Sequence, residues 1–409
     1  MDNYHFTVMT TVPAGYRETL VFRSGGLIMR KYSDSLLFCD VTMDSSDEKR
    51  RKLSLMGRLQ KGENAVRFDM DGANMRLYIN GRLEDEEWPI GGVDLSGDSA
   101  GLYAEIKDVM PGIEPECGDI TDISAWMPYG LRAHVGDCMP FSHDGVWHLF
   151  WLFDRRGHGS KWGLGAHQWA HISTTDFRRW KTYPMAVPIT GQDEGSICTG
   201  STVFAEGRYW CWYAIRSIDG SPARITASVS DDGVNFEKTG RYITLKEPYH
   251  SPSARDPKVI KGEDGLYHMF VTTSRYGKGA LAHLTSPDLE SWTQLIEPII
   301  QLAIADQPEC PDWFEWNGRY YLIFSNFGMG RYVWSDRPFD GWRGEENGMT
   351  GLPIGDEHLR VPKTAFFGDR LIAASFTCIE AGYGGEITFL ELAQNEDGTI
   401  RTFIPAEFA

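Results

Sequence analysis

The chain is patterned as short strands rather than as helices. Apolar residues alternate with polar ones or form brief runs that Gly, Asp and Pro interrupt, and long amphipathic helical stretches are hard to find. From residue 145 onward, a turn glycine followed by an aromatic-rich apolar run returns five times, at 145–151, 207–213, 265–271, 318–324 and 368–374. After each of the first four runs, a strand ends in a Ser/Asp turn that an aromatic residue follows, at 173–180, 230–236, 286–292 and 335–342.

This repeat predicts the architecture of residues 130–409. The repeated unit is about 50 to 60 residues long and has room for four short strands, which is the size of one β-propeller blade. Five units therefore predict an all-β, five-bladed β-propeller. A β-sandwich whose hairpins resemble one another by chance is the alternative, and the fixed order of the two paired signals favours the propeller.

Residues 1–115 do not follow the repeat and predict a separate small β domain. Its clearest part is the stretch 65–83, where two strands flank an Asp71-Gly72 turn and an Asn80-Gly81 turn closes the second strand. This pattern resembles the laminin-G or concanavalin-like β-sandwich. Sandwiches of that kind sometimes hold sugars, but we expect this one to pack against the propeller, with residues 116–129 as the linker.

The charge balance limits the partners. The chain has 57 Asp and Glu residues against 40 Lys and Arg residues, a formal net charge of -17, so a nucleic acid would be repelled. Aromatic residues make up 13% of the chain, a share that suits sugar-stacking surfaces on a β fold. We therefore expect a small carbohydrate as partner, and neither a nucleic acid nor a membrane. The oligomeric state stays open.

Targeting signals and cysteine usage favour the cytoplasm. No basic segment followed by an apolar one opens the sequence, and no apolar run approaches the roughly 18 residues of a membrane span. The seven cysteines, Cys117 among them, are widely spaced and form no C-x-x-C motif, which predicts free thiols rather than a disulfide framework or a zinc site. We expect a cytoplasmic protein without a cofactor or a metal.

Three acids lie at matching places in the repeat. Counted back from the turn glycine of its own unit, Asp137 lies 8 residues away, and Asp256 and Glu309 lie 9 residues away. The innermost strand of each blade lines the central channel, so acids at equivalent positions are expected to converge at the axis. Converging carboxylates raise one another's proton affinity, which lets one act as a general acid while another stays an ionised nucleophile. The pattern predicts glycoside hydrolysis.

The surroundings of these acids resemble those of glycoside hydrolase family 32, the group of invertases, inulinases and levanases. The likeness spans roughly residues 130–405 and is carried by 136–180, Arg255-Asp256-Pro257 and Glu309-Cys310-Pro311-Asp312. The resemblance implies that Asp137 is the nucleophile and Glu309 the general acid/base. It also implies that Asp256 grips fructose hydroxyls beside Arg255, and that Trp162 is an aromatic wall of the sugar subsite.

Several positions depart from the family pattern. Where the family has Asn-Asp-Pro-Asn-Gly, this chain has Gly-Asp-Cys-Met-Pro at 136–140, so the Asn that contacts fructose is absent. Leu152 replaces a Gln, Cys198-Thr199-Gly200 replaces Phe-Ser-Gly, and Ala374 takes the place of a last-blade Trp. The reaction type is therefore better supported than the substrate. The small β domain also precedes the propeller, whereas the family's sandwich normally follows it.

Further substrate-binding candidates lie in the first two blades. The segment 154–162 joins two strands and carries groups that bond sugar hydroxyls, carboxylates or phosphates. We expect this loop to rim the pocket and replace the missing fructose contacts, and a solvated charged hairpin is the alternative. The full set of predicted substrate-binding residues is Arg255, Trp162, His167, Trp169, Thr199, Asp154 and Arg155.

We expect the histidines and cysteines near the acids to form hydrogen bonds or to pack the pocket, rather than to bind metal or act as nucleophiles. For His134, His167 and His171, hydrogen bonding is favoured over metal ligation because they have no carboxylate partner in a recognised motif. Cys138 and Cys310 adjoin the acids and are expected to pack the pocket, because no histidine is placed in sequence to activate either thiol.

We predict a retaining glycosidase that acts on a β-fructofuranoside or a related small oligosaccharide. An inverting furanosidase of the arabinan-cleaving propeller type, a transfructosylase and a non-catalytic carbohydrate-binding propeller remain as alternatives. The separation of the two carboxyl groups distinguishes retention, at about 5 to 5.5 Å, from inversion, at about 6.5 to 9.5 Å.

Overall fold

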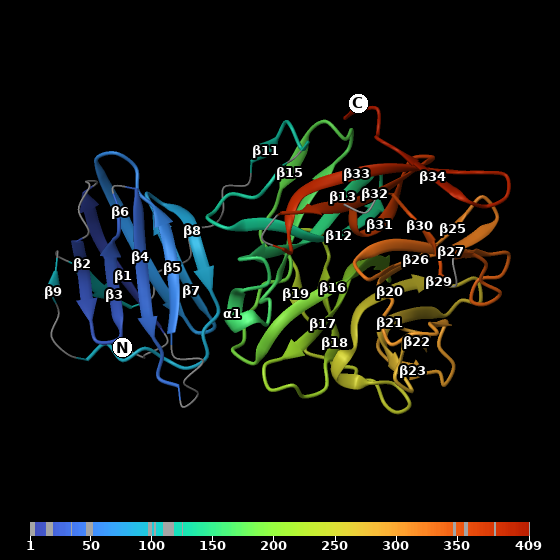
Figure 1. Ribbon diagram of the computed structural model, residues 1–409, viewed down its shortest axis with the longest axis horizontal. Helices are drawn as coiled ribbons and strands as arrows, with labels where there is room; N and C mark the ends of the chain where they lie inside the picture. The colour runs from blue at the N-terminus through green and yellow to red at the C-terminus, as the bar shows by residue number, and fades with distance from the viewer. Residues whose placement is uncertain are drawn as a thin grey trace.

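The chain forms two β domains, shown in the ribbon diagram of a computed structural model (Figure 1). The structure describes residues 5–13, 19–33, 35–45, 52–96, 100–101, 104–108, 118–124, 126–346, 349–355, 359–379 and 382–408. Over these ranges the secondary structure is almost entirely β, and α1 (Ser160–Gly163) and the 3-10 turn η2 (Ser251–Ser253) are short. The all-β prediction is confirmed.

Within the described ranges, no helix has the length and apolar character that crossing a membrane requires. The predicted domain limits, 1–115, 116–129 and 130–409, stay a prediction. Residues 109–117, with Cys117 among them, lie outside the described residues.

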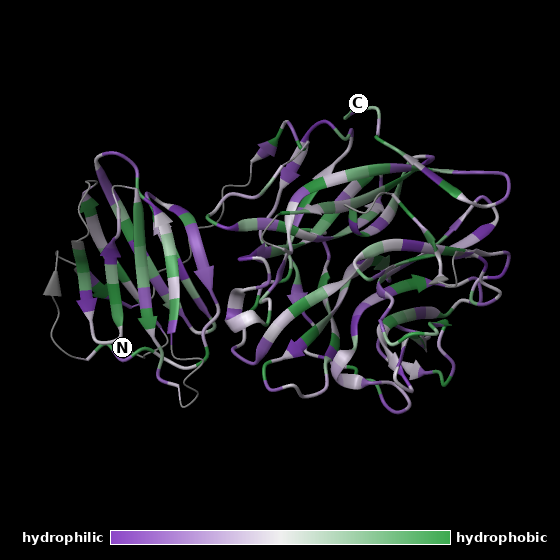
Figure 2. Ribbon diagram, in the orientation of Figure 1, coloured by the Kyte–Doolittle hydropathy of each residue, from purple (hydrophilic) through white to green (hydrophobic). Residues whose placement is uncertain are grey.

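The N-terminal domain is a sandwich of two antiparallel sheets. Hydrophobic and polar residues alternate along its strands (Figure 2), and the facing sides bury a core that includes Phe6, Met29, Leu55 and Phe68. One sheet contains, in order, β10 (Ala104–Lys107), β1 (His5–Pro13), β6 (Glu63–Asp71), β7 (Asn74–Ile79) and β8 (Arg82–Glu87). The other contains β5 (Lys52–Arg58), β4 (Leu36–Thr42), β3 (Leu27–Lys31), β2 (Thr19–Ser24) and β9 (Ala100–Gly101).

The second domain is the predicted five-bladed propeller. Blade 1 comprises β12 (Ala133–His143), β13 (Val146–Arg155), β14 (Gln168–Thr174) and β15 (Trp180–Thr182), with β11 (Asp119–Ile120) paired to β15. Blade 2 comprises β16 (Glu194–Ala205), β17 (Arg208–Ser217), β18 (Arg224–Ser230) and β19 (Glu237–Lys238). Blade 3 comprises β20 (Arg255–Lys261), β21 (Tyr267–Arg275), β22 (Lys278–Ser286) and β23 (Thr293–Gln294), with β24 (Ile300–Gln301) paired to β22.

Blades 4 and 5 complete the ring. Blade 4 comprises β25 (Glu309–Trp316), β26 (Arg319–Asn326), β27 (Met329–Ser335) and β30 (Leu352–Pro353), beside a small hairpin of β28 (Glu345–Glu346) and β29 (Met349–Thr350). Blade 5 comprises β31 (Leu359–Phe367), β32 (Arg370–Cys378), β33 (Gly385–Gln394) and β34 (Ile400–Phe403). The first strands contact one another in the closed order β12, β16, β20, β25, β31 and back to β12, so they are the innermost strands.

Each innermost strand carries a β-bulge at the same place. The register against the second strand shifts between Val135 and Cys138, and the corresponding shifts follow Ile197, Arg255, Glu309 and Arg360. A bulge bends the strand and re-aims side chains, and such bulges are common beside active sites. Each bulge adds one residue, so that two bulged residues lie opposite one residue of the second strand; these pairs are Gly136-Asp137, Cys198-Thr199, Asp256-Pro257, Cys310-Pro311 and Val361-Pro362.

The bulges correct the prediction that the three acids occupy one structural position. Glu309 directly precedes the bulge of blade 4, Asp256 is the first bulged residue of blade 3, and Asp137 is the second bulged residue of blade 1. The backbone at Asp256 and Cys310 has a left-handed φ, 55° and 53°, which turns the chain at this point. The acids therefore occupy three successive positions of one repeated bulge.

The sandwich packs against blades 1 and 2 through buried charged and apolar groups. Asp85 on β8 accepts a hydrogen bond from Arg156 at 2.6 Å and pairs with Arg132 at 3.2 Å. Arg155 is buried against Glu86, with 3.4 Å between the two charged groups. An ion pair desolvated in this way holds two surfaces in one register, because leaving either charge unpaired is costly.

Candidate active site

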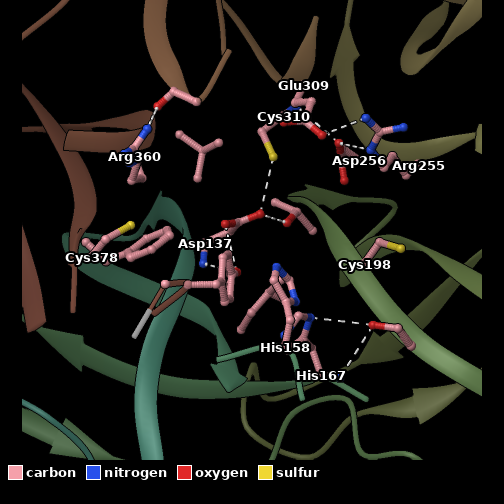
Figure 3. A pocket seen from close by; sticks show the side chains of 18 of the residues that line it. Asp137, His158, His167, Cys198, Arg255, Asp256, Glu309, Cys310, Arg360 and Cys378 are labelled. Atoms are coloured by element: carbon pink, nitrogen blue, oxygen red, sulfur yellow. Dashed lines mark hydrogen bonds and ion pairs between the residues drawn. The ribbon is translucent and has the colours of Figure 1, made fainter. Parts of the chain in front are cut away.

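The candidate active site is a cavity of about 560 Å³ to which all five blades contribute (Figure 3). Each of the five bulges contributes a bulged residue, or the residue next to the bulge, to the lining of this cavity: Asp137, Thr199, Asp256, Glu309 and Val361. The inner strands supply the floor because their bulges lie at the same height around the ring.

Asp137 is held by three side-chain donors from three other strands or connections. The Tyr383 hydroxyl donates to Oδ1 at 2.8 Å and accepts the backbone N–H of Asp137 at 3.0 Å. On Oδ2, the Thr199 hydroxyl donates a short hydrogen bond and the Cys310 thiol lies 3.4 Å away. The carboxylate is buried and is fixed on both oxygens, so it presents one orientation to the cavity.

Arg255 joins the other two acids. Its Nη2 donates to Glu309 Oε1 at 2.7 Å, and its Nε lies 3.5 Å from Asp256 Oδ2. The backbone N–H of Cys310 donates to the same Asp256 oxygen at 3.2 Å. Because the Cys310 thiol also contacts Asp137, one chain of contacts links all three acids around the cavity.

Burial raises the pKa of two of the three acids. It raises the pKa of Asp256 above the ordinary value, against the effect of Arg255 and in line with the charge of Asp137. Burial likewise raises the pKa of Glu309, which Arg255 opposes and Asp256 reinforces. The Glu309 side chain is still 42% exposed, against 4% for Asp256, so Glu309 is the one that a leaving group or water can reach.

The structure brings three of the seven predicted substrate-binding residues into the cavity: His167, Thr199 and Arg255. Two aromatic candidates lie elsewhere. Trp162 packs against the hydrophobic core of the sandwich, and Trp169 is buried in a cluster with Trp88. The indole N–H of Trp169 donates to the Cys198 carbonyl at 2.9 Å, so its ring supports the wall from behind.

The two charged candidates of the loop 154–162, Asp154 and Arg155, lie outside the cavity lining, whereas His158 of the same loop lines the cavity. Asp154 lies behind His167, whose Nε2 is 3.0 Å from its Oδ1. Arg155 faces Glu86 of the sandwich. The loop turns toward the sandwich because the acids of β8 bind its arginines, a contact between domains that no pattern within the loop reveals.

Polar residues outside the predicted substrate-binding set also line the cavity, among them His158, Ser196, Arg216, Arg360 and Tyr383, and of these only His158 lies in the loop predicted to rim the pocket. His158 and Tyr383 lie in connections from the second to the third strand of a blade, and Arg216 lies at the end of β17. These connections return to the end of the channel where the bulges lie. The turn glycine of each blade indicates where the connection between the second and third strands begins. These connections vary in length from 2 to 12 residues, so no shared sequence motif marks the residues that reach the cavity.

One group of side chains has the composition of a metal site. The donor atoms of Asp154, His158 and His167 all lie within 4.8 Å of one another. His171, the third histidine considered from sequence, is buried elsewhere and lies 3.0 Å from His148.

Comparison with known proteins defines the class of the propeller. Residues 139–340 match the family described as "Glycosyl hydrolases family 32 N-terminal domain". Asp256 and Glu309 fall inside the matched residues, and Asp137 lies just before them. The propeller is thus similar to those of glycoside hydrolases of family 32.

Curated relatives agree with this class. The sucrose-6-phosphate hydrolase of Bacillus subtilis (strain 168) is 31% identical over 197 residues, which cover 45% of this chain and 40% of the relative. A β-fructofuranosidase of Oryza sativa subsp. japonica, insoluble isoenzyme 6, is 27% identical over 192 residues, covering 43% of this chain and 30% of that protein. The chain thus spans less than half the length of these relatives. The matched part of its propeller is similar to glycoside hydrolase family 32.

Solved structures share the fold. Fructan 1-exohydrolase IIa from Cichorium intybus superposes with a TM-score of 0.57 at 18% identity, over 67% of this chain and 60% of that one. The family 32 β-fructofuranosidase of Bombyx mori gives 0.52 at 18% identity, over 67% and 65%. The shared part corresponds to a five-bladed propeller.

Proposed function

We propose that this chain is a retaining glycosidase that hydrolyses a β-fructofuranoside. One observation carries the proposal: Asp137, Asp256 and Glu309, from three different blades, line a single cavity. The cavity volume of about 560 Å³ is ample for a small sugar. The curated relatives support the substrate class, because their names are those of sucrose-6-phosphate hydrolases and a β-fructofuranosidase.

Asp137 and Glu309 divide the chemistry. An oxygen of Asp137 attacks the anomeric carbon, the bond from that carbon to the leaving oxygen breaks, and Glu309 gives its proton to that oxygen. Glu309 then takes a proton from water, the water oxygen attacks the same carbon, and the ester to Asp137 breaks. The raised pKa of Glu309 suits its first task, because it keeps the acid protonated to higher pH.

Arg255 and Asp256 bind and orient. The guanidinium holds the Glu309 carboxyl at 2.7 Å, which aims the acid at the leaving oxygen. Asp256 is buried on the floor between Arg255 and Cys310, where its free lone pairs accept sugar hydroxyls. Asp137 attacks from the carboxylate orientation that Tyr383 fixes.

The charge of the cavity wall favours an anionic substrate. Neither Arg216 nor Arg360 forms an ion pair with a carboxylate among the described residues, and both line the cavity. Arg360 Nη1 donates to the Gly328 carbonyl at 2.8 Å, while its buried Nε has no hydrogen-bond partner there. A phosphate on the substrate would give these guanidinium groups an anionic partner in the cavity. We therefore favour a phosphorylated fructoside over the neutral sugar.

The cytoplasm is the compartment that fits this substrate. Cys198, Cys310 and Cys378 line the cavity, and all three are free thiols. Thiols of this kind persist in a reducing compartment.

The test is a substrate panel read by released fructose and by proton NMR of the first-formed anomer. Sucrose, sucrose 6-phosphate, short fructans and aryl arabinofuranosides are compared with the wild type, Asp137→Ala and Glu309→Ala. We expect fructose to be released with retained configuration, and each variant to lose about a hundredfold or more in turnover. Inversion on an arabinofuranoside, or turnover that survives both substitutions, refutes the proposal. Fructosyl transfer to sugar instead of water identifies a transfructosylase.

A further inference from the structure

The loop that walls the cavity beside Asp137 is gathered around three potential metal ligands. Asp154 is the last residue but one of β13, His158 lies in the connection that follows, and His167 directly precedes β14. Their donor atoms lie within 4.8 Å of one another. None of these groups takes part in the glycosidase chemistry proposed above.

The carboxylate of Asp154 organises the group. Its Oδ2 accepts the backbone N–H of Gly157 at 2.9 Å, and its Oδ1 accepts that of His158 at 3.0 Å. These bonds wrap the loop around the carboxylate and bring the His158 ring to within 4.6 Å of the His167 ring, centroid to centroid. Carboxylates that bind metal are typically hydrogen-bonded in this way by their surroundings.

His167 is also oriented from both sides. Its Nε2 faces Asp154 Oδ1 at 3.0 Å, and its Nδ1 lies 3.5 Å from the Ser196 hydroxyl (Figure 3). A polar partner on the second ring nitrogen is the usual arrangement for a metal-binding histidine, because it fixes the tautomer and the ring plane. The ring of His167 is buried, so this orientation is held by packing as well.

A fourth donor faces the same carboxylate. His134 Nδ1 is buried, lies 3.7 Å from Asp154 Oδ2 and makes no hydrogen bond with any described residue. A buried polar atom without a hydrogen bond calls for a partner that the protein does not itself supply. The imidazoles of His134, His158 and His167 therefore lie around the carboxylate of Asp154.

We propose that Asp154, His158 and His167 bind one divalent cation of the zinc class, with His134 as a neighbouring donor. Imidazole nitrogens with a single carboxylate suit Zn²⁺ or Co²⁺, whereas Ca²⁺ and Mg²⁺ prefer all-oxygen sites. Binding at about 2.0 to 2.2 Å requires the ligands to draw closer together than 4.8 Å, which the loop position of His158 permits.

The cation would hold the loop that carries His158 in place beside the nucleophile Asp137. The His158 ring stacks on Tyr383 with 3.7 Å between centroids, and Tyr383 is the hydrogen-bond donor to Asp137 Oδ1. Fixing His158 therefore fixes one wall of the cavity. This inference departs from the expectation that His134 and His167 serve in hydrogen bonding rather than in metal ligation.

The experiment measures metal binding without substrate. The full chain is stripped with a chelator and titrated with Zn²⁺ by calorimetry and with Co²⁺ by visible absorption, and bound metal is counted by mass spectrometry. The variants are His158→Ala, whose side chain lies on an exposed loop, and His167→Gln. The matched control is His5→Ala, because His5 pairs with Asp71 at 3.2 Å in the sandwich and no third potential ligand lies near this pair among the described residues.

We expect one equivalent of metal, intense Co²⁺ absorption bands of a tetrahedral site, and binding weakened about a hundredfold or more in His158→Ala and His167→Gln but unchanged in His5→Ala. A wild-type chain that binds no stoichiometric metal overturns the inference, and so does a His158→Ala variant that binds like the wild type. Melting curves confirm that each variant is folded. Because no turnover is measured, failure here leaves the proposed glycosidase activity standing, and the reverse is also true.

Discussion

The hydroxyl of Tyr383 bridges the backbone amide and the side-chain carboxylate of Asp137. It accepts from the amide at 3.0 Å and donates to Oδ1 at 2.8 Å, although the two residues lie 246 positions apart in the chain. Asp137 belongs to the first blade and Tyr383 to the connection between β32 and β33 of the last. The bond therefore joins the two blades at which the propeller ring closes.

Removing this hydroxyl is expected to slow the chemical step. Tyr383→Phe keeps the ring that stacks on His158 and deletes only the donor. Hydrogen bonds to charged groups contribute about 1.5 to 3 kcal/mol, so kcat should fall roughly ten- to a hundredfold with a smaller change in KM. Steady-state kinetics give both numbers. Tyr249→Phe is the control, because it removes a hydroxyl that donates to the Ile296 carbonyl outside the cavity. Equal losses in the two variants would contradict a positioning role.

Gly136 is expected to tolerate no side chain while Tyr383 is present. A Cβ at this position would lie 2.4 Å from the Tyr383 hydroxyl, closer than any real contact. Gly136→Ala should therefore lower activity at least as much as Tyr383→Phe, whereas the same substitution in a Tyr383→Ala background should cost little more. A double-mutant cycle on kcat/KM measures this coupling. Additive losses would show that the two residues do not compete for space.

The pH profile is expected to report the charge around Glu309. Its pKa is raised, and Asp306 is one of the charges that raise it. Replacing that negative charge by Asp306→Asn stabilises ionised Glu309, so the basic limb of kcat/KM should move to lower pH by less than about one unit. Asp336→Asn, which removes a surface partner of Arg343, should leave the limb in place. A shift to higher pH in Asp306→Asn would contradict the assignment of Glu309 as the acid.

Arg360 is expected to select the phosphorylated substrate. Arg360→Gln removes the guanidinium whose Nε has no partner among the described residues. We expect kcat/KM for sucrose 6-phosphate to fall about tenfold or more relative to sucrose, because a charge-assisted hydrogen bond is lost. Comparing two substrates on one variant cancels any effect of losing the bond to Gly328. Arg208→Gln, which alters a surface pair with Asp231, is the control. An equal fall for both sugars would exclude a phosphate contact.

The repeat could be predicted from the sequence because each blade is encoded locally. The Ser/Asp turns show why: Asp232 Oδ1 accepts the backbone N–H groups of Val234 and Asn235, and Asp288 repeats these bonds in the next blade. A turn of this kind needs only residues next to it, so its residue types recur. The acids followed from the same register, since each lies a nearly constant distance from a turn glycine.

The remaining features depend on contacts between distant segments. Arg155 and Trp162 lie in a loop of blade 1, but the sandwich decides where they point, through Glu86 and the sandwich core. Tyr383 reaches Asp137 because the first and last blades are neighbours in a closed ring. The pairing with the second strand likewise decides which of the two bulged residues faces the cavity. The sequence of one strand alone does not show this choice.

Trapping the covalent intermediate tests the central claim most directly. Glu309→Gln removes the acid/base, and a β-fructofuranosyl fluoride has a leaving group that needs no proton, so the first step can proceed while the second is slow. Mass spectrometry of a peptic digest should then find one hexosyl unit on the peptide that contains Asp137, and none in the Asp137→Ala, Glu309→Gln double variant. A hexosyl unit on any other acid, or an intermediate that forms equally in the double variant, would contradict the role assigned to Asp137.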